Sequence, residues 1–325
     1  MTIHPGRSPF QSSQAPALDP RKFSDPEFTL DGSARARVAL TGLETLWFNT
    51  GTLCNLTCRN CYIESSPRND ALVYLSLAEV RDYLDEAKRL GLAPGEIGFT
   101  GGEPFMNPEI IAMLETTLAA GYRVLVLTNA MRPMLLRKTA LLGLRDQVSG
   151  RLTLRVSLDH HTEAVHDAER GSGAWAKATS GLQWLAQHGF VVDIAGRRLA
   201  GESEAAARAG YAQLFDRLGL DVPADDPGRL VLFPEMDAAV DAPEITEACW
   251  GILGRSPDSV MCATSRMVVK RKGAARPTVV ACTLTPYARD FDLGPTLAGA
   301  AAPVRLNHPH CARFCVLGGA SCSAA

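Results

Sequence analysis

Short apolar runs alternate with longer amphipathic stretches through the middle of the chain. Apolar runs of this length predict buried strands, and apolar residues spaced three or four positions apart predict helices that cover them. The strand-like runs lie at residues 46–48, 96–100, 123–128, 152–158, 191–195 and 230–233. The helix-like stretches lie at residues 76–91, 107–121, 132–144, 174–188 and 203–218. This alternation predicts an α/β fold with a parallel sheet and outer helices, curved into a partial (β/α)6 TIM-type barrel.

Two of the expected helices carry clear boundary signals. Ser76 followed by Glu79 is a capping box, in which each side chain satisfies a backbone N–H of the other residue, and Gly91 suits the end of that helix. In the next helix, Asn107 is expected to cap the N-terminus, with Pro108 at the first helical position. Polar and Gly-rich segments follow the strands, so we expect functional groups at the carboxyl ends of the strands.

Two segments lie outside this alternation. Residues 1–42 are rich in Pro, Ser and Gly without sustained periodicity, and predict an N-terminal arm before a barrel over residues 43–243. Residues 244–325 begin with an apolar helix-like stretch and continue with two apolar runs, 267–269 and 278–280, around a basic turn. They predict a hairpin within a small cysteine-rich α+β C-terminal domain.

The charge balance excludes several kinds of partner. Lys and Arg number 33 and Asp and Glu 35, a net charge of −2, so there is no basic field to attract a polynucleotide.

The apolar runs are far shorter than the ~18 residues that a membrane span needs. The first 20 residues lack the apolar core of a secretory signal, so we expect a cytoplasmic protein.

Nine cysteines are unusual for such a chain. In a reducing compartment, thiols serve metals or catalysis more often than cross-links. Three cysteines lie early in the chain and six lie in its last quarter, with none between. This distribution predicts two separate sites rather than a disulfide framework.

Cys54, Cys58 and Cys61 lie within eight residues, in the loop expected directly after the first barrel strand. A closed all-cysteine zinc site needs a fourth thiolate, and none is near in sequence. On an iron-sulfur cube, three thiolates leave one iron free to bind a group that is not protein. The alternative is a structural zinc loop that borrows a distant cysteine.

This cysteine spacing resembles the signature of radical S-adenosylmethionine (radical SAM) enzymes. In that family, the iron without a cysteine ligand binds the methionine part of S-adenosylmethionine (SAM). The resemblance covers roughly residues 43–235 and includes an aromatic residue after the last cysteine and a Gly-Gly-Glu-Pro segment after the second strand. It implies a set of SAM-binding residues: Tyr62, Gly101, Gly102, Glu103, Pro104, Asn129, Ser157, Asp159 and Arg170.

The resemblance also implies the reaction. A [4Fe-4S] cluster held by the three cysteines takes an electron from a donor such as flavodoxin or ferredoxin. It then cleaves SAM to a 5′-deoxyadenosyl radical, which abstracts hydrogen from the substrate.

The later cysteines resemble the auxiliary-cluster extensions of radical SAM enzymes, called SPASM or, when shortened to one cluster, twitch. The candidate ligands are Cys262, Cys282, Cys311, Cys315 and Cys322, five residues for the four positions of one auxiliary [4Fe-4S] cluster. Cys249 is expected to be a buried packing thiol. Zinc is the alternative metal, since His308 and His310 lie beside Cys311 and would suit it.

Several charged residues are expected near the barrel mouth and are candidates for acid-base work on the substrate. They are Asp193, Arg197, Arg198, Glu235, Asp237, His160 and His161. An auxiliary cluster favours a redox outcome, so the main prediction is dehydrogenation or cyclisation of a small molecule. The alternatives are a maturase of a ribosomal peptide or protein and, outside this class, a non-catalytic zinc-binding protein.

Overall fold

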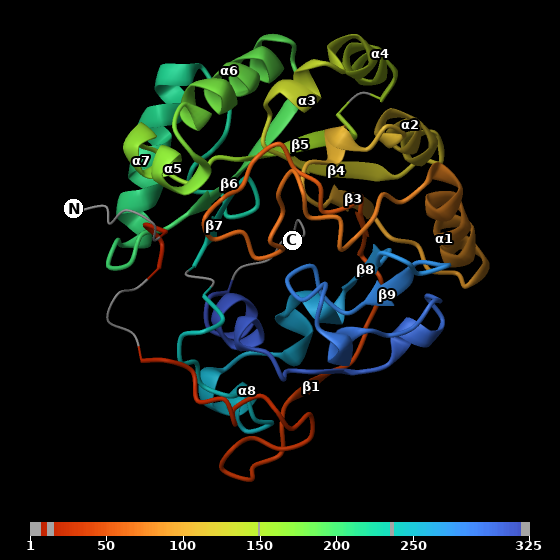
Figure 1. Cartoon of the computed structure of the whole chain (residues 1–325), viewed down its shortest axis with the longest axis vertical. Coiled ribbons are helices and arrows are strands. Elements are labelled where there is room, and N and C mark those ends of the chain that lie inside the picture. Colours follow the sequence, from red (N-terminus) through yellow and green to blue (C-terminus); the bar gives the residue numbers. More distant parts are fainter. Residues whose placement is uncertain (1–7, 12–15, 149, 235–236, 320–325) are drawn as a thin grey trace.

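The computed structural model describes residues 8–11, 16–148, 150–234 and 237–319. Glu235 and Cys322, both predicted site residues, lie outside the described residues. Figure 1 shows a curved sheet with helices on its outer side, and a second group of short elements from the C-terminal part of the chain below it.

Six parallel strands form the curved sheet in the order of the chain, as the apolar runs predict. They are β2 (Thr45–Asn49), β3 (Glu96–Thr100), β4 (Arg123–Thr128), β5 (Leu152–Ser157), β6 (Val191–Arg197) and β7 (Leu230–Phe233). Each strand pairs with the next along the chain, from β2 with β3 to β6 with β7. The expected partial barrel is therefore confirmed.

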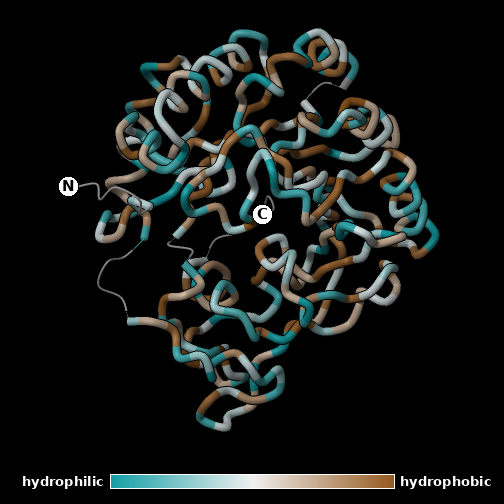
Figure 2. Tube along the Cα trace, viewed as in Figure 1, coloured by the Kyte–Doolittle hydropathy of each residue, from teal (hydrophilic) through white to brown (hydrophobic). Residues whose placement is uncertain are grey.

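The helices that connect these strands lie on the outer face of the sheet (Figure 1). They are α1 (Leu77–Arg89), α2 (Ile110–Ala119), α3 (Arg132–Leu135), α4 (Lys138–Val148), α5 (Glu163–Arg170), α6 (Ala174–Gln187) and α7 (Glu204–Leu218). Figure 2 shows hydrophobic and hydrophilic segments alternating along this ring of helices, as expected of helices with one buried face. The main core fills the space between helices and sheet.

The start of α1 is as predicted, and the start of α2 is not. Ser76 and Glu79 form both halves of a capping box. Asn107 does not cap α2, which begins three residues later with Glu109 before its first residue. The Asn107 amide instead donates to the carbonyls of Thr50 and Leu75, and its Oδ1 accepts from Glu109 N. The Asn107 side chain thus links the segment after β3 to the loop after β2. The local sequence does not indicate this long-range role.

Three further helices, α3, α4 and α5, differ from the sequence pattern. The stretch expected as one helix over residues 132–144 forms α3 and α4, which are separate. The short helix α5 was not predicted; its eight residues follow Thr162 and end before Gly171, which has a φ of 101°. A helix of two turns is too short to show a clear apolar period.

The predicted C-terminal hairpin is present and continues the barrel sheet. Strands β8 (Ser265–Val269) and β9 (Thr278–Val280) are antiparallel, with Met267 opposite Val280. β8 also pairs in parallel with β2, so the eight-stranded order is β7-β6-β5-β4-β3-β2-β8-β9. The other C-terminal elements are α8 (Cys249–Leu253), β10 (Val304–Arg305), a π-helical turn (Cys311–Val316) and 3-10 turns at Pro257–Ser259, Met261–Ala263, Arg289–Phe291 and Gly299–Ala301.

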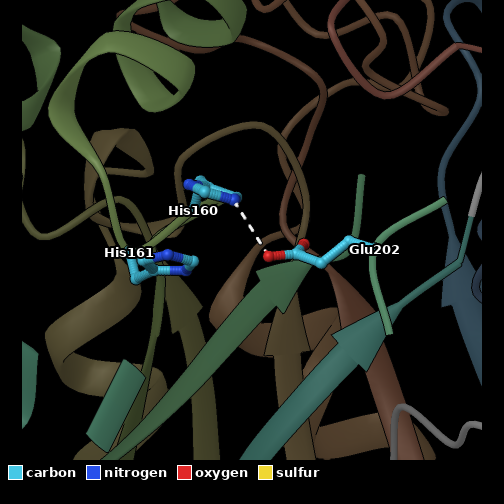
Figure 3. A group of neighbouring side chains, drawn as sticks. All are labelled: His160, His161 and Glu202. Carbon is cyan, nitrogen blue, oxygen red and sulfur yellow. Dashed lines mark ion pairs between the residues drawn. The ribbon is translucent and has the colours of Figure 1, made fainter. Parts of the chain in front are cut away.

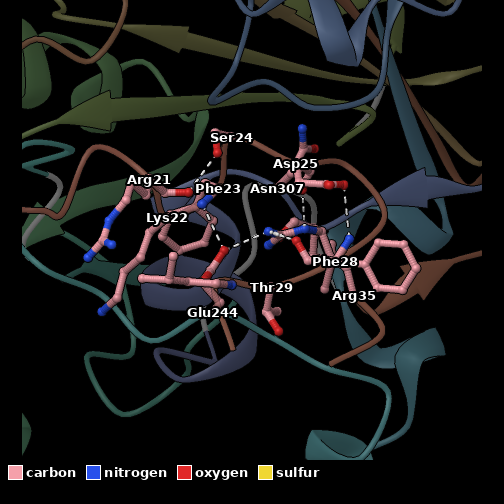
Figure 4. A network of polar contacts seen from close by, with 12 residues as sticks. Arg21, Lys22, Phe23, Ser24, Asp25, Phe28, Thr29, Arg35, Glu244 and Asn307 are labelled. Atoms are coloured by element: carbon pink, nitrogen blue, oxygen red, sulfur yellow. Dashed lines mark hydrogen bonds and ion pairs between the residues drawn. The ribbon is translucent and has the colours of Figure 1, made fainter. Parts of the chain in front are cut away.

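The described part of the N-terminal arm packs on the C-terminal elements. Strand β1 (Arg37–Val38) pairs antiparallel with β10. The buried side chains of Arg35 and Glu244 form an ion pair of 2.6 Å, and the Glu244 carboxylate also accepts from the backbone N–H groups of Phe23 and Leu30 (Figure 4). The division into an arm, a barrel and a C-terminal domain stays a prediction.

No helix of the described residues has the length and apolar character needed to cross a membrane.

Candidate active site

The first three cysteines face one cavity at the carboxyl ends of the strands. Cys54 is buried and Cys58 and Cys61 are half-buried, all in the loop between β2 and α1. The cavity encloses about 640 Å³ of space, part of it open to solvent. Its other lining residues come from the last residues of strands β3 to β6 and from the segments that follow β2 to β5: Tyr62, Ile63, Ser65, Thr100, Gly101, Gly102, Leu127, Thr128, Asn129, Ser157, Arg170 and Arg197.

Two glycines after β3 allow that loop to lie against the backbone of the cysteine loop. Gly101 has a φ of 141°, and a Cβ there would be 2.5 Å from the carbonyl oxygen of Gly51. A Cβ on Gly102 would be 2.2 Å from the carbonyl oxygen of Leu53. Gly102 N and Glu103 N donate to these same two carbonyls, at 2.8 and 3.1 Å. The Gly-Gly pair is therefore needed for a backbone contact next to Cys54.

Glu103, predicted to bind SAM, faces the end of β4. Its side chain is buried, with Oε1 accepting from Thr128 Oγ1 and Oε2 accepting from Asn129 N, both at 2.9 Å. Burial raises the pKa of Glu103 to about 7, although these hydrogen bonds oppose the rise. Pro104 is buried as the first residue of a 3-10 turn (Pro104–Met106). Glu103 thus positions Asn129, whose Nδ2 donates to Asn55 Oδ1 in the cysteine loop.

Asp159 and two arginines form a buried ion network beside the cavity. Arg170 Nε and Nη2 donate to the two oxygens of Asp159, at 2.6 and 3.1 Å, and Arg197 Nε lies 3.4 Å from Oδ1. Burial alone would raise the pKa of Asp159, but the charges of Arg170 and Arg197 outweigh it and hold the pKa well below its usual range. A neighbouring cavity of about 490 Å³ shares Tyr62, Ser157 and both arginines with the first.

Glu169 is a residue of this network that the sequence did not indicate. Its side chain is fully buried, accepts from Ser8 Oγ at 2.6 Å and from Asn60 N at 2.8 Å, and lies 3.5 Å from Arg197. Glu169 therefore connects the N-terminal arm, the cysteine loop and the ion network. A lone carboxylate in a short helix gives no sequence signal for such a role.

The thiols of the first group suit a metal cluster. Burial raises the pKa of Cys54 to about 12 and that of Cys58 to about 11, so a bound cation is needed to favour their thiolate forms. Zn–S bonds of about 2.3 Å place the sulfurs of a tetrahedral site about 3.8 Å apart. Within the described part of the chain, no three cysteines bring their Sγ atoms within 4.8 Å of one another. Three cysteines line this cavity, which is the number of ligands that a [4Fe-4S] cluster with one open iron needs.

Four later cysteines line a separate cavity of about 390 Å³, away from the two described above, and its other walls are mainly apolar. They are Cys262, Cys282, Cys311 and Cys315. Burial raises the pKa of Cys262 to about 11 and that of Cys311 to about 12. His310 also lines this cavity. Cys249 lies in α8 and packs against the apolar side chains of the C-terminal elements, but it is half-buried rather than buried as predicted, and its Sγ accepts from Thr246 N.

Three candidates for acid-base work make structural contacts, two of them through the side chain and Arg198 through its backbone. Asp193 is buried between Arg155 and Arg229, at 3.3 and 2.5 Å. Asp237 Oδ2 accepts from Gln11 Nε2 at 2.9 Å. The Arg198 backbone N–H donates to Phe233 O.

The remaining candidates divide between two places. Arg197 lines both cavities beside the first cysteine group. His160 and His161 belong to a separate group that includes Glu202.

Comparison with known families identifies the segment that carries the first cavity. Residues 48–200 match the model of the radical SAM superfamily. This segment of the chain belongs to the radical SAM superfamily. The family resemblance of the cysteine loop and of the Gly-Gly-Glu-Pro segment is thereby confirmed.

Two curated proteins are similar to part of this chain. The antilisterial bacteriocin subtilosin biosynthesis protein AlbA of Bacillus subtilis (strain 168) is 34% identical over 143 residues, which are 44% of this chain and 30% of AlbA. Mycofactocin maturase MftC of Mycobacterium ulcerans (strain Agy99) is 30% identical over 176 residues, which are 51% of this chain and 42% of MftC. The matches span less than half the length of either relative.

A solved structure shares the fold more widely. Streptococcus suis SuiB bound to SAM superposes with a TM-score of 0.56 at 12% identity, covering 78% of this chain and 63% of SuiB. SuiB bound to its precursor peptide SuiA superposes with a TM-score of 0.55 at 13% identity, covering 76% of this chain and 61% of SuiB. At these identities, the likeness shows the fold alone.

Proposed function

We propose that this radical SAM protein cleaves SAM reductively in the first cavity and abstracts hydrogen from a peptide substrate. The observation that carries the proposal is the convergence of Cys54, Cys58 and Cys61 with the Gly101–Gly102 backbone on one cavity at the strand ends. A bound [4Fe-4S] cluster supplies the electron that breaks a carbon–sulfur bond of SAM.

The residues around the cluster position would hold SAM and exclude water. Tyr62 and Ser157 line both neighbouring cavities, where an adenosine group would extend from one to the other. Arg170 and Arg197 are balanced by the carboxylates of Asp159 and Glu169, and both arginines line the first cavity, where their guanidinium groups would donate hydrogen bonds to the SAM carboxylate. Glu103 keeps the end of β4 in place through Thr128 and Asn129.

Replacing Cys58 tests the catalytic proposal. We expect anaerobically reconstituted, dithionite-reduced protein to convert SAM to 5′-deoxyadenosine, and C58A to lose at least about 100-fold of this activity because the cluster loses a ligand. C249A is the matched control, since Cys249 contacts Thr246 and lines neither cysteine cavity. Chromatography of 5′-deoxyadenosine measures both. Equal product from C58A and wild type would overturn the proposal.

The comparisons favour a peptide substrate over the small molecule that was the main prediction from sequence. Two relatives are named for bacteriocin biosynthesis and for mycofactocin maturation, and SuiB has been solved with a precursor peptide. The cavity beside the first cysteine group is partly open to solvent, which suits entry of a chain segment. These points support the peptide class without specifying its sequence.

The substrate class can be tested with fractions of a cell extract. We expect the extract fraction of about 1–10 kDa to increase 5′-deoxyadenosine formation above the rate without substrate, and prior digestion of that fraction with pepsin to abolish the increase. Inactivated pepsin is the control. Stimulation that survives digestion, or that resides in the fraction below 1 kDa, would favour the small-molecule alternative.

We further infer that Cys262, Cys282, Cys311 and Cys315 hold one auxiliary [4Fe-4S] cluster. Their number completes a cluster without Cys249 or Cys322. The mainly apolar cavity would shield such a cluster from water. A flavodoxin or ferredoxin remains the proposed electron donor.

A further inference from the structure

A short segment of the N-terminal arm, residues 8–11, packs against groups at the edge of the first cavity. Figure 1 shows it on the side of the curved sheet where β7 lies. Ser8 is buried, and its Oγ donates to the buried carboxylate of Glu169 at 2.6 Å. Phe10 N donates to Ser8 Oγ, and Gln11 N donates to Ser8 O, both at 3.2 Å. The segment is therefore a turn fixed to the ion network through Ser8.

The Phe10 ring of this turn lies against the guanidinium group of Arg197. The guanidinium carbon lies over the ring, 5.4 Å from its centroid. An aromatic face attracts a cation, and the attraction grows when both groups are shielded from water. Phe10 is 1% exposed and the Arg197 side chain 11%. The contact is therefore of the stronger, water-shielded kind.

The other contacts of Arg197 engage its N–H groups and are mostly long. Nη2 donates to Asn60 O, in the cysteine loop, at 3.0 Å. Nε lies 3.4 Å from Asp159 and Nη1 lies 3.5 Å from Glu169, which are ion-pair distances longer than good hydrogen bonds. These contacts leave room for the guanidinium to shift, and the Phe10 ring restrains it further.

His160 supports Phe10 as an uncharged neighbour. The two ring centroids are 6.5 Å apart. Burial lowers the pKa of His160 to about 4, so its ring is neutral at neutral pH. The Thr162 backbone N–H donates to His160 Nδ1 at 3.1 Å, which places the ring proton on Nε2, facing Glu202 Oε1 at 3.6 Å (Figure 3). His160 also stacks on His161, with centroids 4.0 Å apart, so its ring is held in place.

We propose that Phe10 is a positioning residue that holds Arg197 in place for the carboxylate of SAM. Arg197 lines both neighbouring cavities, whereas Phe10 is not among the lining residues of either. Phe10 therefore acts on SAM through Arg197 and not by contact. This inference rests on the proposed SAM site, and it gives the N-terminal arm a part in that site.

Binding of SAM to cluster-loaded, unreduced protein tests the proposal without a catalytic step. At equal iron content, we expect F10A to weaken SAM binding about tenfold, measured by anaerobic equilibrium dialysis with labelled SAM. F10L keeps an apolar side chain but has no aromatic face, and should weaken binding by about threefold or more. F28A is the matched control and should bind as wild type does, because Phe28 belongs to the same arm and is 53% exposed. Thermal unfolding confirms that each variant folds.

A double-mutant cycle separates positioning from general support of the fold. In the R197Q background, adding F10A should weaken SAM binding by less than about twofold, because the group that Phe10 holds is gone. A general loss of structure in the arm would instead weaken binding by the same factor in both backgrounds. Equal SAM affinity in F10A and wild type, or an equal factor in the two backgrounds, would overturn the proposal.

SAM cleavage is measured separately from SAM binding. Wild type that binds SAM but forms no 5′-deoxyadenosine under reductant would contradict the proposed function alone. Wild type that cleaves SAM, together with F10A that binds SAM equally tightly, would contradict the role of Phe10 alone.

Discussion

Single residues decide how closely the strand-end loops approach the cysteine loop. The space next to Leu53 and Gly51 admits glycine only, so the contact between the Gly101–Gly102 segment and the residues before Cys54 is made by backbone alone. The Gly-Gly-Glu-Pro resemblance predicted these positions. It did not predict that the Glu103 side chain is directed at β4, because that contact depends on Thr128 and Asn129, which are distant in sequence.

Substituting Gly102 tests the importance of this close contact. In G102A the added Cβ would lie 2.2 Å from Leu53 O, so the cysteine loop must shift. A displacement of about 1 Å in a catalytic site costs about 100-fold in rate, and we expect a loss of 5′-deoxyadenosine formation of that order. The rate is compared with that of wild type at equal iron content.

G143A is the control for an added methyl group. Gly143 lies in α4 with open space around its Cβ position, so alanine there should stabilise the fold by about 1 kcal/mol and leave cleavage unchanged. Full activity in G102A would show that the cysteine loop tolerates the shift, contrary to this account.

At the scale of elements, the strands were predictable and some connections were not. Strands β3, β4 and β7 have the predicted bounds because continuous apolar runs mark strands that are buried on both faces. The start of α2 was missed because Asn107 serves two distant carbonyls. The four cysteines proposed to hold the auxiliary cluster could not be selected from sequence either, because separate turns and loops bring them to one cavity.

The auxiliary site can be separated from the catalytic one by iron analysis. We expect wild type to bind about eight irons after anaerobic reconstitution and C282A to bind about four, since a cube needs its full ligand set. C282A should still cleave SAM, because the first cysteine group is unchanged. C249A should keep about eight irons. If C282A lost zinc rather than iron, or if it kept the full iron content of wild type, the ligand assignment would be contradicted.

At the scale of the molecule, the terminal segments pack on each other and on the barrel. The arm contributes β1, the Arg35–Glu244 ion pair and the Ser8 contact to Glu169, and the hairpin β8–β9 continues the sheet beyond β2. A polar arm without periodicity gave no sign of these contacts in the sequence. The radical SAM fold was predictable because its motif and its strand alternation are both local, whereas the pairings of β1 with β10 and of β8 with β2 are long-range.

The central claim is that the cluster bound by Cys54, Cys58 and Cys61 leaves one iron open for SAM. Electron–nuclear double resonance on the reduced protein, mixed with SAM that carries ¹⁵N at its amino group, tests this claim most directly. The account predicts a strong ¹⁵N coupling to the cluster in wild type and in C282A. A reduced cluster that shows no ¹⁵N coupling with SAM present would contradict it.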